Sequence, residues 1–129
     1  MMCLPGLTSA PWHDTQAPQF AWVKELEKQT PAIREEYLRL KELQVPSDYV
    51  PSGEHKLHQG SDSQEHWFWF TFMDQGRKLE NNLKQCPMTW KALESIGPDL
   101  MTGTPFSFAF FSSLAPGSTI APHTAPLNF

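Results

Sequence analysis

One residue near the C-terminus, His123, is a candidate for metal chemistry. The stretch FFSSLAPGSTIAPHTAPLNF places His123 directly after Pro122, behind a Pro-Gly turn at Pro116 and Gly117. A neutral imidazole is a common ligand of transition metals, whereas Ser112 and Ser113 have no partner that spacing alone would identify as a base. A lone histidine near a strand end can also be structural or face solvent, so the spacing alone leaves both interpretations open.

The other four histidines form no recognisable metal-binding pattern. His55 and His58 lie three apart in HKLH, a spacing that could hold a metal from one helical turn. A stable zinc site takes four ligands and usually includes cysteines at short spacing, and no cysteine lies near HKLH, His13 or His66. We therefore expect HKLH to belong to a solvated loop.

Sequence motifs of other enzyme classes are absent. The segments GSDS and GTP lack the strand–loop–helix context and the lysine of a phosphate-binding loop, and no G-x-S-x-G motif occurs. Glu35 and Glu36 are neighbours on a predicted helix, where a solvated charged face is a better interpretation than an acid/base pair. Trp67 and Trp69 could stack on a ligand, although buried aromatic side chains usually pack a core.

The composition is that of one folded domain. The chain has 129 residues, 40% of them hydrophobic and 12% aromatic, enough to bury a substantial core. The net charge of −4 and the absence of a Lys/Arg block argue against nucleic acid and anionic membranes as partners. Cys3 and Cys86 are expected to be reduced, independent thiols. No signal peptide or transmembrane segment is apparent, which predicts a cytoplasmic protein for the chain as written.

Three segments predict helices after an irregular, proline-containing lead-in over residues 1–18. They cover about residues 20–29, 31–43 and 87–96. Thr30 and Pro31 suit the N-cap and the first helical position of the second helix. Its residues Ile33, Tyr37 and Leu40 share one face, and Glu35 can pair with Arg39 on the other.

Aromatic and alternating segments predict strands at about residues 66–73, 105–114 and 118–123. The unbroken run WFWFTFM is typical of a strand covered on both faces. In FSFAFFSSL, the side chains of Phe106, Phe108 and Phe110 should point one way, and Ser107, Ala109 and Phe111 the other. Residues 44–66 predict a long polar loop, with a turn at residues 74–77.

The C-terminal stretch resembles the signature of the aspartyl/asparaginyl β-hydroxylase family. The matching features are a serine-containing strand, the Pro-Gly turn, the Pro-His pair, and then Pro126 and Asn128 in the following loop. The segments PWHD, FAWVKELE, IREEYLRL and CPMTWKALESI also resemble this family, so the resemblance covers most of residues 11–129.

The resemblance implies an α+β fold, with a helical N-terminal lead-in and an incomplete double-stranded β-helix of the jelly-roll, cupin-like type. Residues 1–18 would be the irregular lead-in, and residues 19–129 the N-terminal portion of a hydroxylase-like domain. The implied activity is 2-oxoglutarate- and iron(II)-dependent hydroxylation of aspartyl, asparaginyl or prolyl residues in peptides. The implied partner is therefore a peptide or protein substrate.

The same resemblance implies the roles of individual residues. His123 would be the first iron ligand, Ser112 would help to hold 2-oxoglutarate, and Leu114 would line the co-substrate pocket. Thr124 and Asn128 would lie beside the metal. No residue is assigned as a catalytic acid or base.

The sequence departs from the family pattern in two ways. Ala125 replaces a glycine and Leu127 a threonine. The family also has a second iron histidine and a co-substrate arginine further along, at positions beyond Phe129, where the sequence as written ends. We therefore expect this chain alone to be inactive and to bind neither iron nor 2-oxoglutarate. The alternative is a non-catalytic binding module. If the chain is part of a longer secretory-pathway protein, its compartment would be the endoplasmic reticulum lumen.

Overall fold

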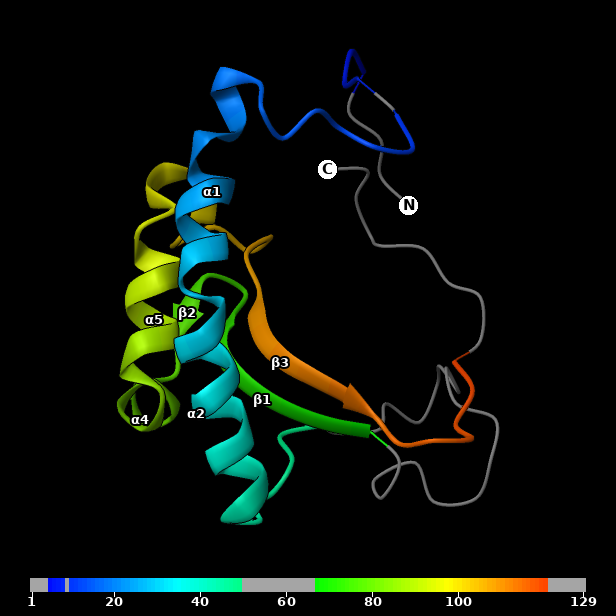
Figure 1. The fold of residues 1–129 in the computed structure, drawn as a ribbon, viewed down its shortest axis with the longest axis vertical. Coiled ribbons are helices and arrows are strands. Elements are labelled where there is room, and N and C mark those ends of the chain that lie inside the picture. The colour runs from blue at the N-terminus through cyan, green and yellow to red at the C-terminus, as the bar shows by residue number, and fades with distance from the viewer. Residues whose placement is uncertain (1–4, 9, 50–66, 121–129) are drawn as a thin grey trace.

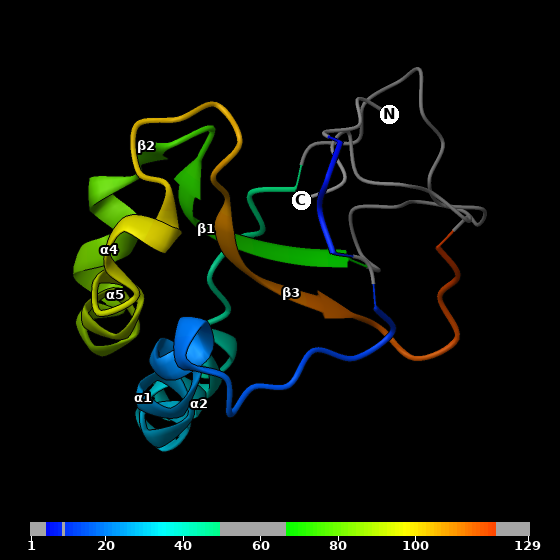
Figure 2. The same ribbon diagram turned by 90° about the horizontal axis from the view of Figure 1, so that it is seen from above.

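The computed structural model describes residues 5–8, 10–49 and 67–120. Within these ranges, four α-helices lie on one face of an antiparallel sheet (Figures 1 and 2). The helices are α1 (Ala21–Lys28), α2 (Thr30–Glu42), α4 (Glu80–Gln85) and α5 (Pro87–Glu94), with short 3-10 turns η1 (Pro18–Phe20) and η2 (Gly97–Leu100). The strands are β1 (Trp67–Asp74), β2 (Arg77–Lys78) and β3 (Ala109–Leu114), in the order β2-β1-β3. The predicted α+β class is confirmed, while the jelly roll stays a prediction.

The three predicted helices are confirmed, with bounds shifted by no more than two residues. The predicted cap of α2 is wrong by one position, because the helix begins at Thr30 itself and Gln29 is the N-cap, without a side-chain cap bond. The helix α4 and the strand β2 were not predicted. Both are short, and Leu83 is the only buried residue of α4, so neither produces a clear apolar period.

The strand β1 is confirmed, whereas β3 is shorter than predicted and begins at Ala109 rather than near residue 105. Before it, the chain packs onto the β1–β2 turn, where the Gly76 N–H donates to the Ser107 carbonyl at 2.8 Å. The Gly103 N–H donates to the Gly76 carbonyl at 3.1 Å. Of the predicted strand at residues 118–123, Ile120 forms an isolated bridge, and residues 121–123 lie outside the described residues.

The core lies between the helices and the sheet. Its fully buried side chains are Leu40, Phe70, Phe72, Met73 and Cys86. The β3 side chains alternate as predicted, with Ala109 buried and Phe110 exposed. The described ring contacts join Phe72 to Phe111, at a centroid distance of 5.0 Å, and Phe111 to Tyr37 of α2, at 5.4 Å. The odd-numbered face of β3 therefore packs against the helices.

Glu36 corrects the prediction of a solvated charged face on α2. Its side chain is buried, with a relative exposure of 5%, and its carboxylate accepts hydrogen bonds from the N-terminus of α5. Arg39 donates to the Gln85 carbonyl. In the described part of the chain no ion pair joins Glu35 to Arg39, so that predicted pair is wrong. The side chains of Glu36 and Arg39 instead connect α2 to the α4–α5 junction.

Candidate functional site

Among the described residues, aromatic side chains cluster on the sheet face that points away from the helices. We call this cluster the aromatic face, and it consists of Trp67 and Trp69 of β1, Phe110 of β3 and Tyr49, which packs against them. Tyr49 contacts both tryptophans, with ring centroids 5.1 Å from Trp67 and 4.9 Å from Trp69. The two indoles lie 5.1 Å apart, and Trp69 lies 4.7 Å from Phe110. These separations are those of interacting aromatic pairs, so the predicted packing role of the tryptophans holds on this side of the sheet.

The extended segment before Tyr49 is fixed along β1 by side-chain and backbone hydrogen bonds. Ser47 Oγ accepts from the Trp69 N–H at 2.9 Å and lies 3.3 Å from the Trp67 carbonyl, to which it donates. The Asp48 N–H donates to the Trp69 carbonyl at 2.9 Å, and Asp48 Oδ2 accepts from the Thr71 N–H at 2.7 Å. Serine and aspartate side chains readily bond to nearby backbone groups. Here they hold Tyr49 over the two indoles.

Ser112 and Leu114 lie on this same face of β3. The register pairs Ser112 with Trp69 and Leu114 with Trp67, and facing residues of an antiparallel pair point to the same side of the sheet. Ser112 Oγ accepts a hydrogen bond of 2.7 Å from Trp67 Nε1. Both residues are exposed to solvent. The structure therefore brings these two predicted site residues together, beside a tryptophan pair whose contact with Ser112 was not predicted.

One donor on the aromatic face has no partner among the described residues. Trp69 Nε1 is buried there and makes no hydrogen bond. A buried N–H without an acceptor costs free energy. Sequence reasoning missed this feature, because the indole orientation depends on packing against Tyr49 and Phe110 rather than on the alternation of β1.

The predicted iron ligand His123 lies outside the described residues, as do Thr124 and Asn128. The HKLH histidines and His66 also lie outside them. Within the described ranges, no group of three or more His, Cys, Asp or Glu side chains could hold a metal ion. The described residues alone therefore do not fit an iron centre, whereas the exposed Ser112 hydroxyl fits an acceptor oxygen of a ligand.

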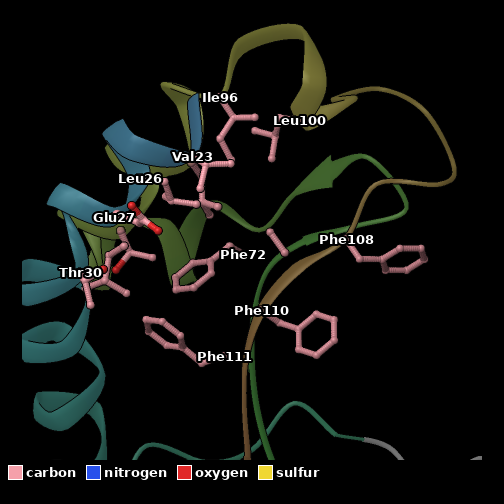
Figure 3. Close-up of a pocket in the computed structure, with 14 residues that line it drawn as sticks. Val23, Leu26, Glu27, Thr30, Phe72, Ile96, Leu100, Phe108, Phe110 and Phe111 are labelled. Atoms are coloured by element: carbon pink, nitrogen blue, oxygen red, sulfur yellow. The ribbon is translucent and has the colours of Figure 1, made fainter. Parts of the chain in front are cut away.

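An apolar groove lies on the helix side of the sheet, along β3 (Figure 3). Its volume is about 540 Å³. Its walls come mainly from apolar side chains of α1, α5, η2 and β3, including Val23, Leu26, Leu93, Leu100 and Phe111. Phe111 points toward the helices in Figure 3, while Phe108 and Phe110 point to the other side of the strand. The groove and the Ser112 hydroxyl therefore lie on opposite faces of β3.

Cys86 is a free, fully buried thiol next to Glu36 and Arg39. Burial is the main reason why the pKa of this thiol is raised from 9.0 to about 11, and the Glu36 carboxylate raises it further, while Arg39 acts in the opposite direction. A thiolate is the reactive form of cysteine. Cys86 is therefore a packing residue rather than a nucleophile.

No helix among the described residues is long and apolar enough to cross a membrane.

Comparison with known proteins gives consistent family matches. The family described as aspartyl/asparaginyl beta-hydroxylase matches residues 27–129. An ornithine lipid ester-linked acyl 2-hydroxylase from Rhizobium tropici is 34% identical over 124 residues, which is 95% of this chain and 40% of that protein. The aspartyl/asparaginyl beta-hydroxylase of Mus musculus is 32% identical over 124 residues, 95% of this chain and 16% of that protein. The chain thus spans less than half the length of these relatives.

Proposed function

We propose, because the chain belongs to the aspartyl/asparaginyl beta-hydroxylase family, that it is the N-terminal part of a 2-oxoglutarate- and iron(II)-dependent hydroxylase domain. The observation that carries the proposal is the position of Ser112 and Leu114. The two residues assigned to the co-substrate from the family signature lie side by side on the open sheet face, away from the helices. The family match extends over both of them and over His123.

The proposed roles of the chain's own residues follow from their chemistry. Bound iron and 2-oxoglutarate together supply the oxidation that inserts one atom of O₂ into a substrate C–H bond. Ser112 would donate a hydrogen bond to a carboxylate oxygen of the co-substrate, and Leu114 would exclude water beside it. His123 would contribute one imidazole nitrogen to the metal. One imidazole holds iron weakly, so we place the remaining ligands and a charge partner for the carboxylate outside these 129 residues.

The proposed substrate is an aspartyl, asparaginyl or prolyl residue in a peptide. The names of the relatives include both a peptide-residue hydroxylase and a lipid acyl hydroxylase, and both reactions insert oxygen into a C–H bond. Peptide is the first proposal because the family description names aspartyl and asparaginyl residues.

A second candidate function is that of a non-catalytic binding module. It is favoured by β3, which forms the edge of the described sheet, and by the 50% exposure of Phe108 beside it. Edge strands with exposed apolar side chains are common sites of strand addition by a partner.

The test uses the chain extended through its natural downstream coding sequence, supplied with iron(II), 2-oxoglutarate and O₂. One reaction contains peptides with Asp, Asn and Pro, and the other contains an ornithine-containing lipid. Mass spectrometry then reports the gain of one oxygen atom. Oxidised peptide supports the proposal, and oxidised lipid alone would replace the substrate class. If neither product forms, or if a stop codon follows Phe129, the binding module is the better interpretation.

A further inference from the structure

We propose that a basic cleft between α2 and the α4–α5 junction binds an acidic segment of a partner protein, in which a carboxylate lies next to an apolar side chain. The cleft has a volume of about 350 Å³. It lies in the layer of helices, on the other side of the sheet from the aromatic face (Figure 1). The residues that line it, which define the basic cleft, are Arg39, Leu40, Leu43, Lys84, Gln85 and Pro87.

The charge of the basic cleft comes from two cations. Arg39 projects from α2 and donates to the Gln85 carbonyl, and Lys84 lies in the last turn of α4. The ion pairs among the described residues include neither of these two cations. The buried Glu36 carboxylate accepts its three hydrogen bonds from the first turn of α5 instead. Both cations are therefore available to an anion from outside the described part of the chain.

The guanidinium of Arg39 is oriented before any ligand arrives. It donates to the Gln85 carbonyl and lies next to the buried Cys86 thiol, and these contacts restrict the plane of the group. A guanidinium has five N–H donors in a rigid fork, so donors remain after these contacts. A carboxylate matches this fork with two oxygens. Arg39 is therefore the expected anchor, and Lys84 adds a second charge at the rim of the basic cleft.

Exposed apolar side chains flank the two cations. Leu43, at the C-terminal end of α2, is 66% exposed, and Met88, which follows Pro87 of the cleft, is 44% exposed. Arginine and methionine are enriched in protein–protein interfaces, where apolar side chains surround the charged anchors. A small inorganic anion would leave Leu43 and Met88 in water. The surface therefore fits a ligand that combines a carboxylate with an apolar side chain.

The charges around the basic cleft favour a discrete carboxylate over an extended anionic surface. Glu35 and Glu42 lie on α2 one turn to either side of Arg39, where side chains are neighbours on a helix surface. The whole chain has a net charge of −4. A membrane rich in anionic lipids or a nucleic acid would bring many negative charges close to these carboxylates. A single acidic side chain of a protein segment can reach Arg39 and Lys84 without this repulsion.

The first measurement is a nuclear magnetic resonance titration of the nitrogen-15-labelled 129-residue chain in dilute solution. The probe is an acetylated, amidated tetrapeptide of alternating glutamate and leucine, and the control peptide has glutamine in place of glutamate. We expect the N–H signals of Leu43 and Gln85 to shift with the glutamate peptide alone, and sodium chloride at about 0.5 M to weaken the binding. Equal binding of the two peptides, or no shift up to millimolar peptide, overturns the inference.

The second measurement compares variants that each remove one positive charge. Lys84→Gln should weaken the binding of the glutamate peptide by up to about fivefold, the range of an exposed ion pair, and Arg39→Gln by at least as much. Arg34→Gln is the matched control, because Arg34 is exposed on a different side of α2. Circular dichroism checks folding. Lys84 is exposed and has no described hydrogen bond, so its variant tests the inference even if Arg39→Gln unfolds.

Two results of these comparisons would contradict the basic cleft as a site for an acidic protein segment. One is equal affinity of the glutamate peptide for wild type, Lys84→Gln and Arg34→Gln. The other is binding of the wild-type chain to vesicles that contain phosphatidylglycerol, lost in Lys84→Gln, without binding of the glutamate peptide. That second result would assign the cleft to an anionic membrane surface.

Discussion

Glu36 and Thr89 are joined by two hydrogen bonds, from the Thr89 backbone N–H and from its hydroxyl, each 2.7 Å from Glu36 Oε2. The other carboxylate oxygen accepts from the Met88 N–H at 2.9 Å. These N–H groups belong to the first turn of α5, which has no intrahelical acceptors for them. Glu36 therefore caps α5 from α2, and its negative charge lies at the favourable end of the helix dipole.

Glu36→Ala should lower the free energy of unfolding by about 2–4 kcal/mol, because it leaves buried donors without an acceptor. Glu36→Gln should cost less, since its amide oxygen still accepts from one N–H. Glu35→Ala is the matched control, because Glu35 is exposed, and its effect should stay within about 0.5 kcal/mol. Urea unfolding in dilute solution measures all three. Equal effects of Glu36→Ala and Glu35→Ala would contradict the capping role.

Cys86 should resist thiol reagents in the native protein. Its pKa of about 11 leaves little thiolate at pH 8, and its side chain is fully buried. The folded-state pKa is higher than the ordinary 9.0, so this thiol favours folding below pH 9 and that contribution is lost as the pH rises toward 11. The measurement is alkylation at pH 8 with and without urea, together with unfolding curves between pH 8 and pH 11. Fast alkylation without urea would show that the thiol is accessible.

Gly76→Ala should destabilise the β1–β2 turn strongly. Gly76 has a φ of +73°, and a Cβ atom there would lie 2.2 Å from the Thr104 carbonyl oxygen. Gly117→Ala is the control, because Gly117 has a φ of +79° and a Cβ there would have no neighbour within 4 Å among the described residues. We expect about 1 kcal/mol for Gly117→Ala from backbone strain alone, and at least about 2 kcal/mol for Gly76→Ala. Equal losses in urea unfolding would show that the close approach to Thr104 relaxes without cost.

The helices α2 and α5 and the strand β1 could be predicted because their signals are local. Pro31 and Pro87 mark helix starts, and the aromatic run of β1 is long enough to favour a buried strand. The contact of Glu36 with Thr89 spans 53 residues, so no local pattern contains it. One signal was available, since Glu36 lies four residues before the buried Leu40 and therefore shares its helix face.

In the candidate site, too, the features with a local sequence signal could be predicted, and the contacts between distant residues could not. The positions of Ser112 and Leu114 on one face follow from strand alternation, which is a local rule. The contact of Ser112 with Trp67 depends on the register between two strands and on the rotamer of an indole. Neither can be read from a single sequence. His123 and its neighbours stay predictions, because they lie outside the described residues.

The isolated chain should self-associate as its concentration rises. β3 is the edge of the described sheet, and Phe108 and Phe110 beside it are 50% and 38% exposed. Apolar edge strands promote aggregation. Phe108→Lys should improve solubility, whereas Leu43→Lys, which changes an exposed residue at the end of α2, should help less. Light scattering over a concentration series measures this. A monomer with a sharp, reversible thermal transition would contradict the prediction.

The 129-residue chain should neither retain iron(II) at micromolar metal nor convert 2-oxoglutarate to succinate. His123 would supply one imidazole, and the described residues add no group of three metal ligands. For the co-substrate carboxylate, the Ser112 hydroxyl is a neutral donor, which does not replace the paired, charged hydrogen bonds of an arginine.

Extension through the natural downstream sequence should restore both iron binding and the conversion of 2-oxoglutarate. In that longer form, His123→Ala should abolish succinate formation, and Ser113→Ala should not. The measurement is succinate after anaerobic loading with iron followed by O₂. Succinate from the 129-residue chain that disappears with His123→Ala would show that these residues suffice for catalysis.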